Sequence, residues 1–136
     1  MSISVVIVDN EQVDRFIARR RFSRSKRFGE IFEFSSGIDF VRAFRLPPGI
    51  DMPAGHTTLV LMDIRMPGLD GFQTIRNLMS QLPEGSEANG LVFAICSSSN
   101  SALDRERAAG ISEIKAYIAK PLLQDDVDRL AELCVA

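Results

Sequence analysis

The chain has 136 residues, of which 46% are hydrophobic and 25% charged, and its formal net charge is −2 at pH 7. This length suits one globular domain with a single core, and we expect one domain over residues 1–136. No apolar run is long enough to span a membrane, and the N-terminus lacks the basic flank and cleavage site of a signal peptide. We therefore expect a cytoplasmic protein that does not contact a membrane.

Five apolar strand patterns alternate with five helix patterns along the chain. In chain order they are the strand Ile3–Val8, a helix from Val13 to about Phe22, the strand Glu30–Phe34, a helix that begins at Ser35-Ser36-Gly37, the strand Thr58–Met62, a helix over 72–82, the strand Leu91–Cys96, a helix over 102–109, the strand Ile114–Ala119 and a helix over 122–133. The strands are apolar throughout and no hairpin signal joins them. This pattern predicts an α/β fold, a parallel sheet with helices on both faces.

The expected helices carry apolar residues at helical spacing. These are Val13, Phe16 and Ile17 in the first helix, Phe40, Val41 and Phe44 in the second, and Phe72, Ile75, Leu78 and Met79 in the third. The loop over 46–57 is longer than a compact connection needs. It contains the only histidine, His56, which we interpret as a solvated loop residue without a partner. The two cysteines, Cys96 and Cys134, lack metal-ligand spacing, and we expect both to be reduced structural thiols.

The stretch LVLMDIRMPGLDGF places a carboxylate, Asp63, directly after a strand that reads as fully buried. An uncompensated carboxylate in apolar surroundings costs several kcal/mol, so it should be paired, metal-bound or functional. Polar residues end the other strands as well: Asp9, Asn10 and Glu11 after the first, Ser97 after the fourth and Lys120 after the fifth. Because the carboxyl ends of parallel strands meet at one edge of a sheet, we expect these groups to converge.

Together these side chains describe a site for a phosphoryl group carried by a carboxylate. Acidic and other oxygen ligands suit a hard cation such as Mg²⁺, while a lysine ammonium and a serine hydroxyl can hold phosphoryl oxygens. Asp63 would be the nucleophile and Lys120 and Ser97 would hold the group. Each residue alone has an ordinary explanation as a helix cap, turn former or surface charge. Their occurrence at four strand ends argues against coincidence.

VIVDNEQVDR, LVLMDIRMPGLDGF, the apolar run into Ser97 and YIAKPL together resemble the receiver domain of two-component response regulators, from Ile3 to Leu133. The resemblance implies a flavodoxin-like (βα)5 receiver with strand order 2-1-3-4-5. It also implies the roles of seven residues: Asp63 as phosphoacceptor, Asp9, Asn10 and the backbone carbonyl of Arg65 as Mg²⁺ ligands beside Asp63, Ser97 and Tyr117 as switch residues, and Lys120 as the invariant lysine, with a cis bond before Pro121. Asn10 departs from the family's acidic pair and removes one charge from the metal site.

The basic residues are unevenly distributed. Seven of the 16 lie between Arg15 and Arg27, a stretch that contains no acid. We favour a solvated helix face over a face that docks a partner. Nucleic acid is a weaker option, because the patch is short and lacks interleaved aromatic residues, and we expect no nucleic-acid partner.

Three functions are compatible with these residues. The leading hypothesis is a stand-alone receiver, phosphorylated by a sensor histidine kinase or a histidine phosphotransfer protein. It would act on an unknown downstream protein through the fourth helix, the fifth strand and the fifth helix. The second is a receiver-fold module that binds a partner without phosphorylation. Asn10, in place of the family's second acid, would indicate such a module. The third, an aspartate-nucleophile phosphohydrolase, needs an acid two residues after the nucleophile, where Arg65 stands, so we do not expect a conventional enzyme.

Overall fold

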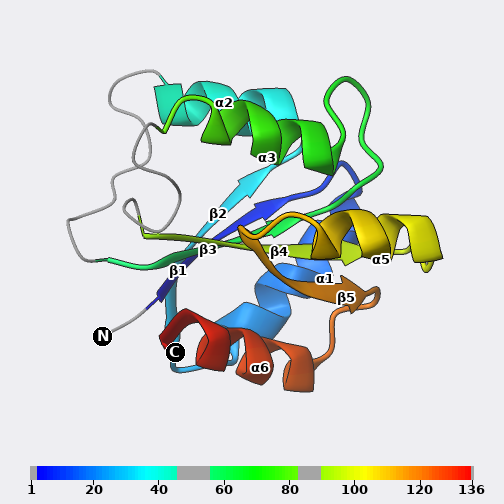
Figure 1. Cartoon of the computed structure of the whole chain (residues 1–136). Coiled ribbons are helices and arrows are strands. Elements are labelled where there is room, and N and C mark those ends of the chain that lie inside the picture. Colours follow the sequence, from blue (N-terminus) through cyan, green and yellow to red (C-terminus); the bar gives the residue numbers. More distant parts are fainter. Residues whose placement is uncertain (1–2, 46–55, 83–89, 136) are drawn as a thin grey trace.

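The computed structural model describes residues 3–45, 56–82 and 90–135, so the predicted loop over 46–57 lies largely outside the described residues. Its single sheet has five parallel strands in the order β2-β1-β3-β4-β5 (Figure 1). The strands are β1 (Ile3–Val8), β2 (Phe28–Phe34), β3 (Thr58–Met62), β4 (Leu91–Ser97) and β5 (Ile114–Ala119). The helices are α1 (Gln12–Ser23), α2 (Gly37–Arg45), α3 (Gly71–Met79), α5 (Ala102–Ala109) and α6 (Gln124–Val135). The predicted flavodoxin-like α/β fold with strand order 2-1-3-4-5 is confirmed.

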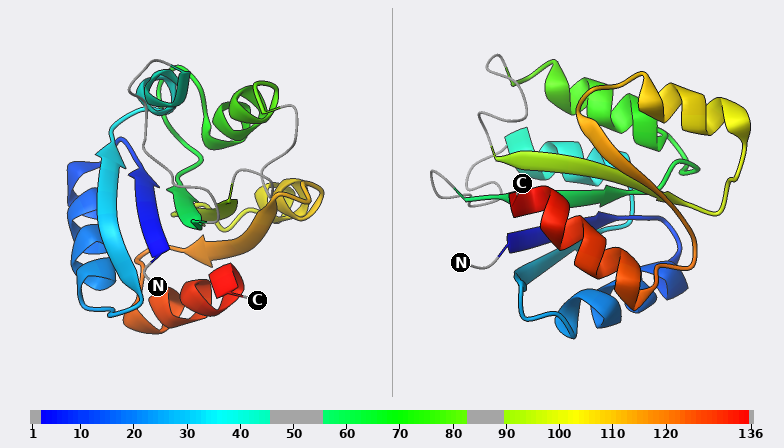
Figure 2. Two further views of the ribbon diagram at one scale, coloured as in Figure 1. Left: turned by 90° about the vertical axis from the view of Figure 1, so that its left-hand side faces the viewer. Right: turned by 60° about the horizontal axis from the view of Figure 1, so that its bottom comes forward.

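The helices form two layers on opposite faces of the sheet (Figures 1 and 2). Successive side chains of a strand point to opposite faces, so the continuous apolar runs supply both layers. Val5 and Ile7 of β1 belong to the core beneath α1 and α6. Val6 and Val8 belong to the core beneath α2, α3 and α5. This explains why a strand with no polar alternation is stable in the centre of the sheet.

The buried face of α1 differs from the expected one. Val13 and Phe16 are 68% and 58% exposed, whereas Ala18 and Phe22 are buried. Phe22 packs edge-to-face against Phe28, with ring centroids 4.8 Å apart, and Phe28 begins β2 two residues before the predicted start. The expectation was wrong for Val13 and Phe16, whereas Ile17 is half-buried and lines the same pocket as Asp14. Polar residues of α1 take part in its inward face, as the contacts of Asp14 described below show.

His56 has a partner at the edge of the sheet where the strands begin, so its interpretation as a partnerless loop residue was wrong. Its Nε2 atom lies 2.7 Å from the Ser4 hydroxyl. The backbone of Gly90 approaches the same segment: its carbonyl accepts a hydrogen bond from the Thr58 N–H at 2.7 Å. Gly90 has a φ of +69°, and a Cβ atom there would lie 2.1 Å from the His56 carbonyl oxygen, so only glycine fits.

The two cysteines agree with the expectation of reduced thiols. Cys96 and Cys134 are both free thiols. Burial raises the pKa of the Cys96 thiol to about 12 and that of Cys134 to about 11, so both are protonated at neutral pH. None of the helices in the described part of the chain has the length and apolar character required to cross a membrane.

Candidate functional site

The carboxyl edge of the sheet brings three of the predicted site residues into contact. Asp9 follows β1, Asp63 follows β3 and Lys120 follows β5. The Lys120 Nζ atom lies 2.7 Å from Asp9 Oδ2 and 3.5 Å from Asp63 Oδ1. Both residues are buried, with whole-residue exposures of 5%. One ammonium group thus bridges two buried carboxylates that are 54 residues apart in the chain.

Backbone contacts hold these side chains in place. The Asp63 N–H donates to the Val8 carbonyl at 2.9 Å, which fixes the end of β3 beside the end of β1. The next helix begins close to Asp63, because a Cβ atom on Gly71 would lie 2.1 Å from the Asp63 carbonyl oxygen. Asp70 caps this helix through a reciprocal capping box with Gln73. A glycine is therefore required where the chain turns back behind the carboxylate.

Lys120 is anchored through its own backbone. Its N–H donates to the Ser97 carbonyl at 2.9 Å, so the chain beyond β5 is held against the end of β4. The bond between Lys120 and Pro121 is cis, as predicted. Ser97 itself is fully buried, and its hydroxyl accepts a hydrogen bond from the Ser99 N–H at 3.1 Å.

The surroundings raise the pKa of Asp63 and also that of Lys120, which stays charged. Burial, and then the neighbouring Asp9 carboxylate, raise the pKa of Asp63 from 3.8 to about 6, and the nearby Lys120 only partly opposes this rise. For Lys120, burial disfavours the charge, but hydrogen bonds to Asp9 and Asp14 outweigh it and hold the pKa above its ordinary value. The cluster therefore carries more negative than positive charge, and a further cation can be attracted to it.

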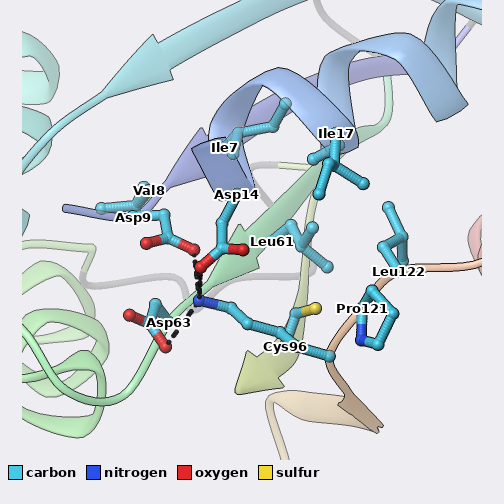
Figure 3. Close-up of a pocket in the computed structure, with 12 residues that line it drawn as sticks. Ile7, Val8, Asp9, Asp14, Ile17, Leu61, Asp63, Cys96, Pro121 and Leu122 are labelled. Atoms are coloured by element: carbon cyan, nitrogen blue, oxygen red, sulfur yellow. Dashed lines mark hydrogen bonds and ion pairs between the residues drawn. The ribbon is translucent and has the colours of Figure 1, made fainter. Parts of the chain in front are cut away.

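Asp14, on the first turn of α1, is a member of the site that sequence reasoning missed. Its Oδ2 atom accepts a hydrogen bond from Lys120 Nζ at 2.9 Å. Figure 3 shows the carboxylates of Asp9, Asp14 and Asp63 converging on one nitrogen atom, and the dashed lines mark their contacts with this Lys120 Nζ. Asp14 follows the strand end Asp9 by five residues, which places it on the helical turn above that end. This spacing from Asp9 is the feature of the sequence that could have identified Asp14 as a site residue.

The donor set suits a divalent cation. Within the described ranges, no three His, Cys, Asp or Glu side chains are placed to hold a metal, so a cation at Asp9 and Asp63 would need further oxygen ligands. The Oδ1 atom of Asn10 is buried and has no hydrogen-bond partner in the described chain. Buried acceptors are normally satisfied by protein, water or an ion. Two carboxylates and an orphaned amide oxygen are the hard ligands that Mg²⁺ prefers, so these residues fit the ion.

Ser97 and Tyr117 do not touch but are connected through Ser99. The Tyr117 hydroxyl donates to the Ser99 carbonyl at 2.7 Å, and the Ser99 N–H is the donor to Ser97 described above. The Arg105 guanidinium lies over the Tyr117 ring, 4.6 Å from its centroid. The ring of Tyr117 is therefore held at the surface formed by α5 and β5.

The side chain of Arg65 connects the loop that follows Asp63 to α5. Its Nη2 atom lies 3.3 Å from Asp104 Oδ2, and the same carboxylate accepts a hydrogen bond from the Ser99 hydroxyl at 2.6 Å. The loop that follows Asp63 is thus tied to the first turn of α5 and to the chain segment that holds Tyr117.

Much of the basic stretch 15–27 contacts the protein itself. Arg15 donates to the Asp9 carbonyl at 2.6 Å, and Arg19 forms an ion pair with Glu33 of β2. Arg27 pairs with Glu132 of α6 at 2.5 Å. Arg20 and Arg24 are exposed and have no ion-pair partner among the described residues. Part of the stretch therefore fastens α1 to its neighbours, and only part is available to a partner.

Comparisons with known proteins agree with this arrangement. Residues 5–132 match the family model of the response regulator receiver domain. A two-component response regulator from Cytophaga hutchinsonii has a similar structure, with a TM-score of 0.82 at 23% identity over 99% of this chain and 98% of the other. A response regulator receiver protein from Dyadobacter fermentans gives 0.76 at 24% identity over 97% and 94%.

A third similar structure is that of the CheX–CheY–BeF3–Mg²⁺ complex from Borrelia burgdorferi, with a TM-score of 0.75 at 21% identity over 98% of this chain and 90% of that one. At these identities the likeness to solved structures concerns the fold. The search of curated proteins gave no match.

Proposed function

Because the chain belongs to the response regulator receiver domain family, a family of two-component signalling, we propose that it is a phosphoryl-accepting switch whose phosphoacceptor is Asp63. The phosphoryl group would come from a histidine of a sensor kinase or of a phosphotransfer protein. The observation that carries this proposal is the Lys120 ammonium that bridges the buried carboxylates of Asp9 and Asp63. We further propose a single cytoplasmic domain over residues 1–136.

The proposed chemistry uses the groups at the carboxyl edge of the sheet. An Asp63 oxygen forms a bond to phosphorus while the bond between phosphorus and the donor histidine nitrogen breaks. Asp9, Asn10 and the Arg65 backbone carbonyl would hold Mg²⁺ beside Asp63, and the ion supplies positive charge that offsets the charge of the transferring group. Lys120 and the Ser97 hydroxyl would hold the remaining phosphoryl oxygens.

Output would follow from a rearrangement at Ser97. If its hydroxyl moves toward a phosphoryl oxygen, the hydrogen bond to Ser99 is lost, and with it the support of the Tyr117 hydroxyl. Two such conformers need differ by only a few kcal/mol for phosphorylation to change their populations. The surface of α5, β5 and α6 would then present a different shape to a downstream protein. The fluorescence or NMR signal of Tyr117 should therefore change on phosphorylation.

A receiver that binds its partner without phosphorylation is the second candidate, and Asn10 is the residue that favours it. The two candidates are separated by measuring intact mass after incubation with acetyl phosphate and Mg²⁺. We expect the wild-type chain to gain one phosphoryl group and Asp63→Asn to gain none. Asp39→Asn on α2 is a control for loss of an exposed carboxylate, and it should be phosphorylated normally. Phosphorylation of the Asp63→Asn variant would contradict the assignment.

The exposed part of the basic stretch would assist the approach of an acidic phosphodonor protein, because α1 lies beside the site. Attraction of this kind speeds association and weakens with salt. Reversing Arg20 and Arg24 to Glu leaves Arg15 and Arg19, which contact Asp9 and Glu33, unchanged. It should slow transfer from a protein donor without slowing transfer from acetyl phosphate. Reversing Arg42 and Arg76, which are exposed on α2 and α3, is the matched control. Equal slowing with both donors would point to a structural role.

A further inference from the structure

We infer that Asp14 is a positioning residue for Lys120, and that it keeps the ammonium group in the site when a divalent cation takes over Asp9 and Asp63. The inference rests on the proposed function, which assigns Asp9 and Asp63 as the metal-binding carboxylates. It concerns a residue outside the expected ligand set.

The ammonium of Lys120 has three carboxylate partners in the described structure. They lie at 2.7 Å (Asp9 Oδ2), 2.9 Å (Asp14 Oδ2) and 3.5 Å (Asp63 Oδ1). The shortest contact is thus with an expected metal ligand, and the longest is with the expected phosphoacceptor. Asp14 is the partner that stands outside the metal set.

Binding of a divalent cation would change how the Lys120 ammonium is shared among its three carboxylate partners. A cation held by Asp9 and Asp63 would draw on the same carboxylates that now hold the ammonium, and the two positive groups would repel each other. The side chain of Lys120 is only 11% exposed, so the ammonium cannot exchange these partners for bulk water without leaving the pocket. It requires another negative partner within reach, and Asp14 already contacts it.

The position of Asp14 suits this role. It lies on α1, whereas the other two carboxylates follow β1 and β3, so it approaches the ammonium from a different element. Its side chain is 32% exposed, compared with 8% for Asp9 and 6% for Asp63, which places it toward the solvent side of the cluster. The ammonium can therefore move outward, toward Asp14, as the cation enters.

The test measures the Mg²⁺ affinity of the unphosphorylated protein by NMR titration. Asp14→Asn should weaken Mg²⁺ binding roughly three- to tenfold, because the displaced ammonium loses its remaining carboxylate. Glu11→Gln is the control: it removes the same charge from an exposed side chain that has no hydrogen-bond or ion-pair partner within the described residues, and its effect should stay below about twofold. If Asp14→Asn does not give a folded protein, Asp14→Ser replaces it.

The same comparison in a Lys120→Met background isolates the mechanism. Without the ammonium, Asp14→Asn should weaken Mg²⁺ binding by less than about twofold, as Glu11→Gln does. An effect as large as, or larger than, that in the wild-type background would show that Asp14 acts on the ion directly, and would overturn the inference. So would an unchanged affinity of Asp14→Asn, or a wild-type protein that does not bind Mg²⁺.

No phosphodonor enters this experiment. A chain that shows the expected pattern of affinities but gains no mass with acetyl phosphate would retain the inference and lose the proposed function. A chain that is phosphorylated on Asp63 but shows no coupling between Asp14 and Lys120 would do the reverse.

Discussion

Met62 and Asp63 are adjacent in the chain and similarly shielded from water, with exposures of 0% and 5%. The interior of the sheet, where Met62 lies, consists of apolar side chains packed between the strands and α2, α3 and α5. The carboxyl edge, where Asp63 lies, contains carboxylates gathered around one ammonium group. Burial in the first region removes apolar surface from water and stabilises the fold. Burial in the second region removes charge from water and opposes folding.

Burial of a residue therefore does not by itself indicate a contribution to stability. Two regions separated by one peptide bond are expected to respond to substitution with opposite sign. Substitutions at the interior should reduce the free energy of unfolding, whereas neutralisation of Asp63 at the edge should increase it. Substitutions at the edge should impair function more than substitutions in the interior, since the edge carries the proposed chemistry.

The largest effect is expected in the interior. Phe93 in β4 is fully buried, and Phe93→Ala removes a ring from the core beneath α3 and α5. We expect the free energy of unfolding to fall by about 3–5 kcal/mol, as for other large-to-small core substitutions. Urea denaturation followed by circular dichroism measures this change. A loss below about 1 kcal/mol would mean that the interior is not the main source of stability.

The next effect has the opposite sign and depends on pH. Because the pKa of Asp63 is raised from 3.8 to about 6, the folded state holds this proton more tightly than the unfolded state. The resulting penalty on folding is present above pH 6, declines as the pH falls from 6 toward 3.8, and is absent below that value. Without metal, Asp63→Asn should therefore raise the free energy of unfolding by about 1–3 kcal/mol at pH 7.5 and by much less near pH 4.

The control for that prediction is Asp39→Asn, which removes an exposed carboxylate and should change the stability by less than about 0.5 kcal/mol. Both variants are unfolded with urea at the two pH values in the presence of a chelator. A destabilised Asp63→Asn protein at pH 7.5 would show that the attraction of Lys120 outweighs burial, and the contrast between the two regions would then disappear.

The smallest effect concerns Asn10, which adds no charge to the edge. Asn10→Asp places another carboxylate beside Asp9 and Asp63, so the metal-free protein should lose up to about 1 kcal/mol through like-charge repulsion. Its Mg²⁺ affinity should increase, since an ionised carboxylate attracts the ion more strongly than an amide. Calorimetric titration measures the affinity. Equal or weaker binding would mean that the orphaned Asn10 oxygen does not face the ion.

The sequence predicted the sheet well because its signal is local. A continuous apolar run such as VVIV has no polar face, so it requires covering on both sides and therefore a parallel arrangement with helices above and below. The same arrangement brings the strand ends to one edge, which is why the contact of Lys120 with Asp9 and Asp63 was expected from residues far apart in the chain.

The rotation of α1 could not be predicted in the same way. Hydrophobic spacing favoured Val13 and Phe16 as inward residues, but the helix turns Asp14 toward the site instead. The contact between Asp14 and Lys120 joins residues 106 apart, and its formation depends on how one helix sits over the end of one strand. The roles of Asn10, Arg65 and Tyr117 depend on bound groups and on motions, so they stay predictions.

The order of the strands also sets how firmly each one is held. β3 has neighbours on both sides, whereas β5 pairs only with β4 in the described sheet. A strand at the border of a sheet has fewer backbone hydrogen bonds to break, so it opens locally at lower free energy than a central one. Amide protons of β5 should therefore exchange with deuterated solvent faster than those of β3. The strand that carries Tyr117 and leads into Lys120 is thus one that can fluctuate while the centre of the sheet remains closed.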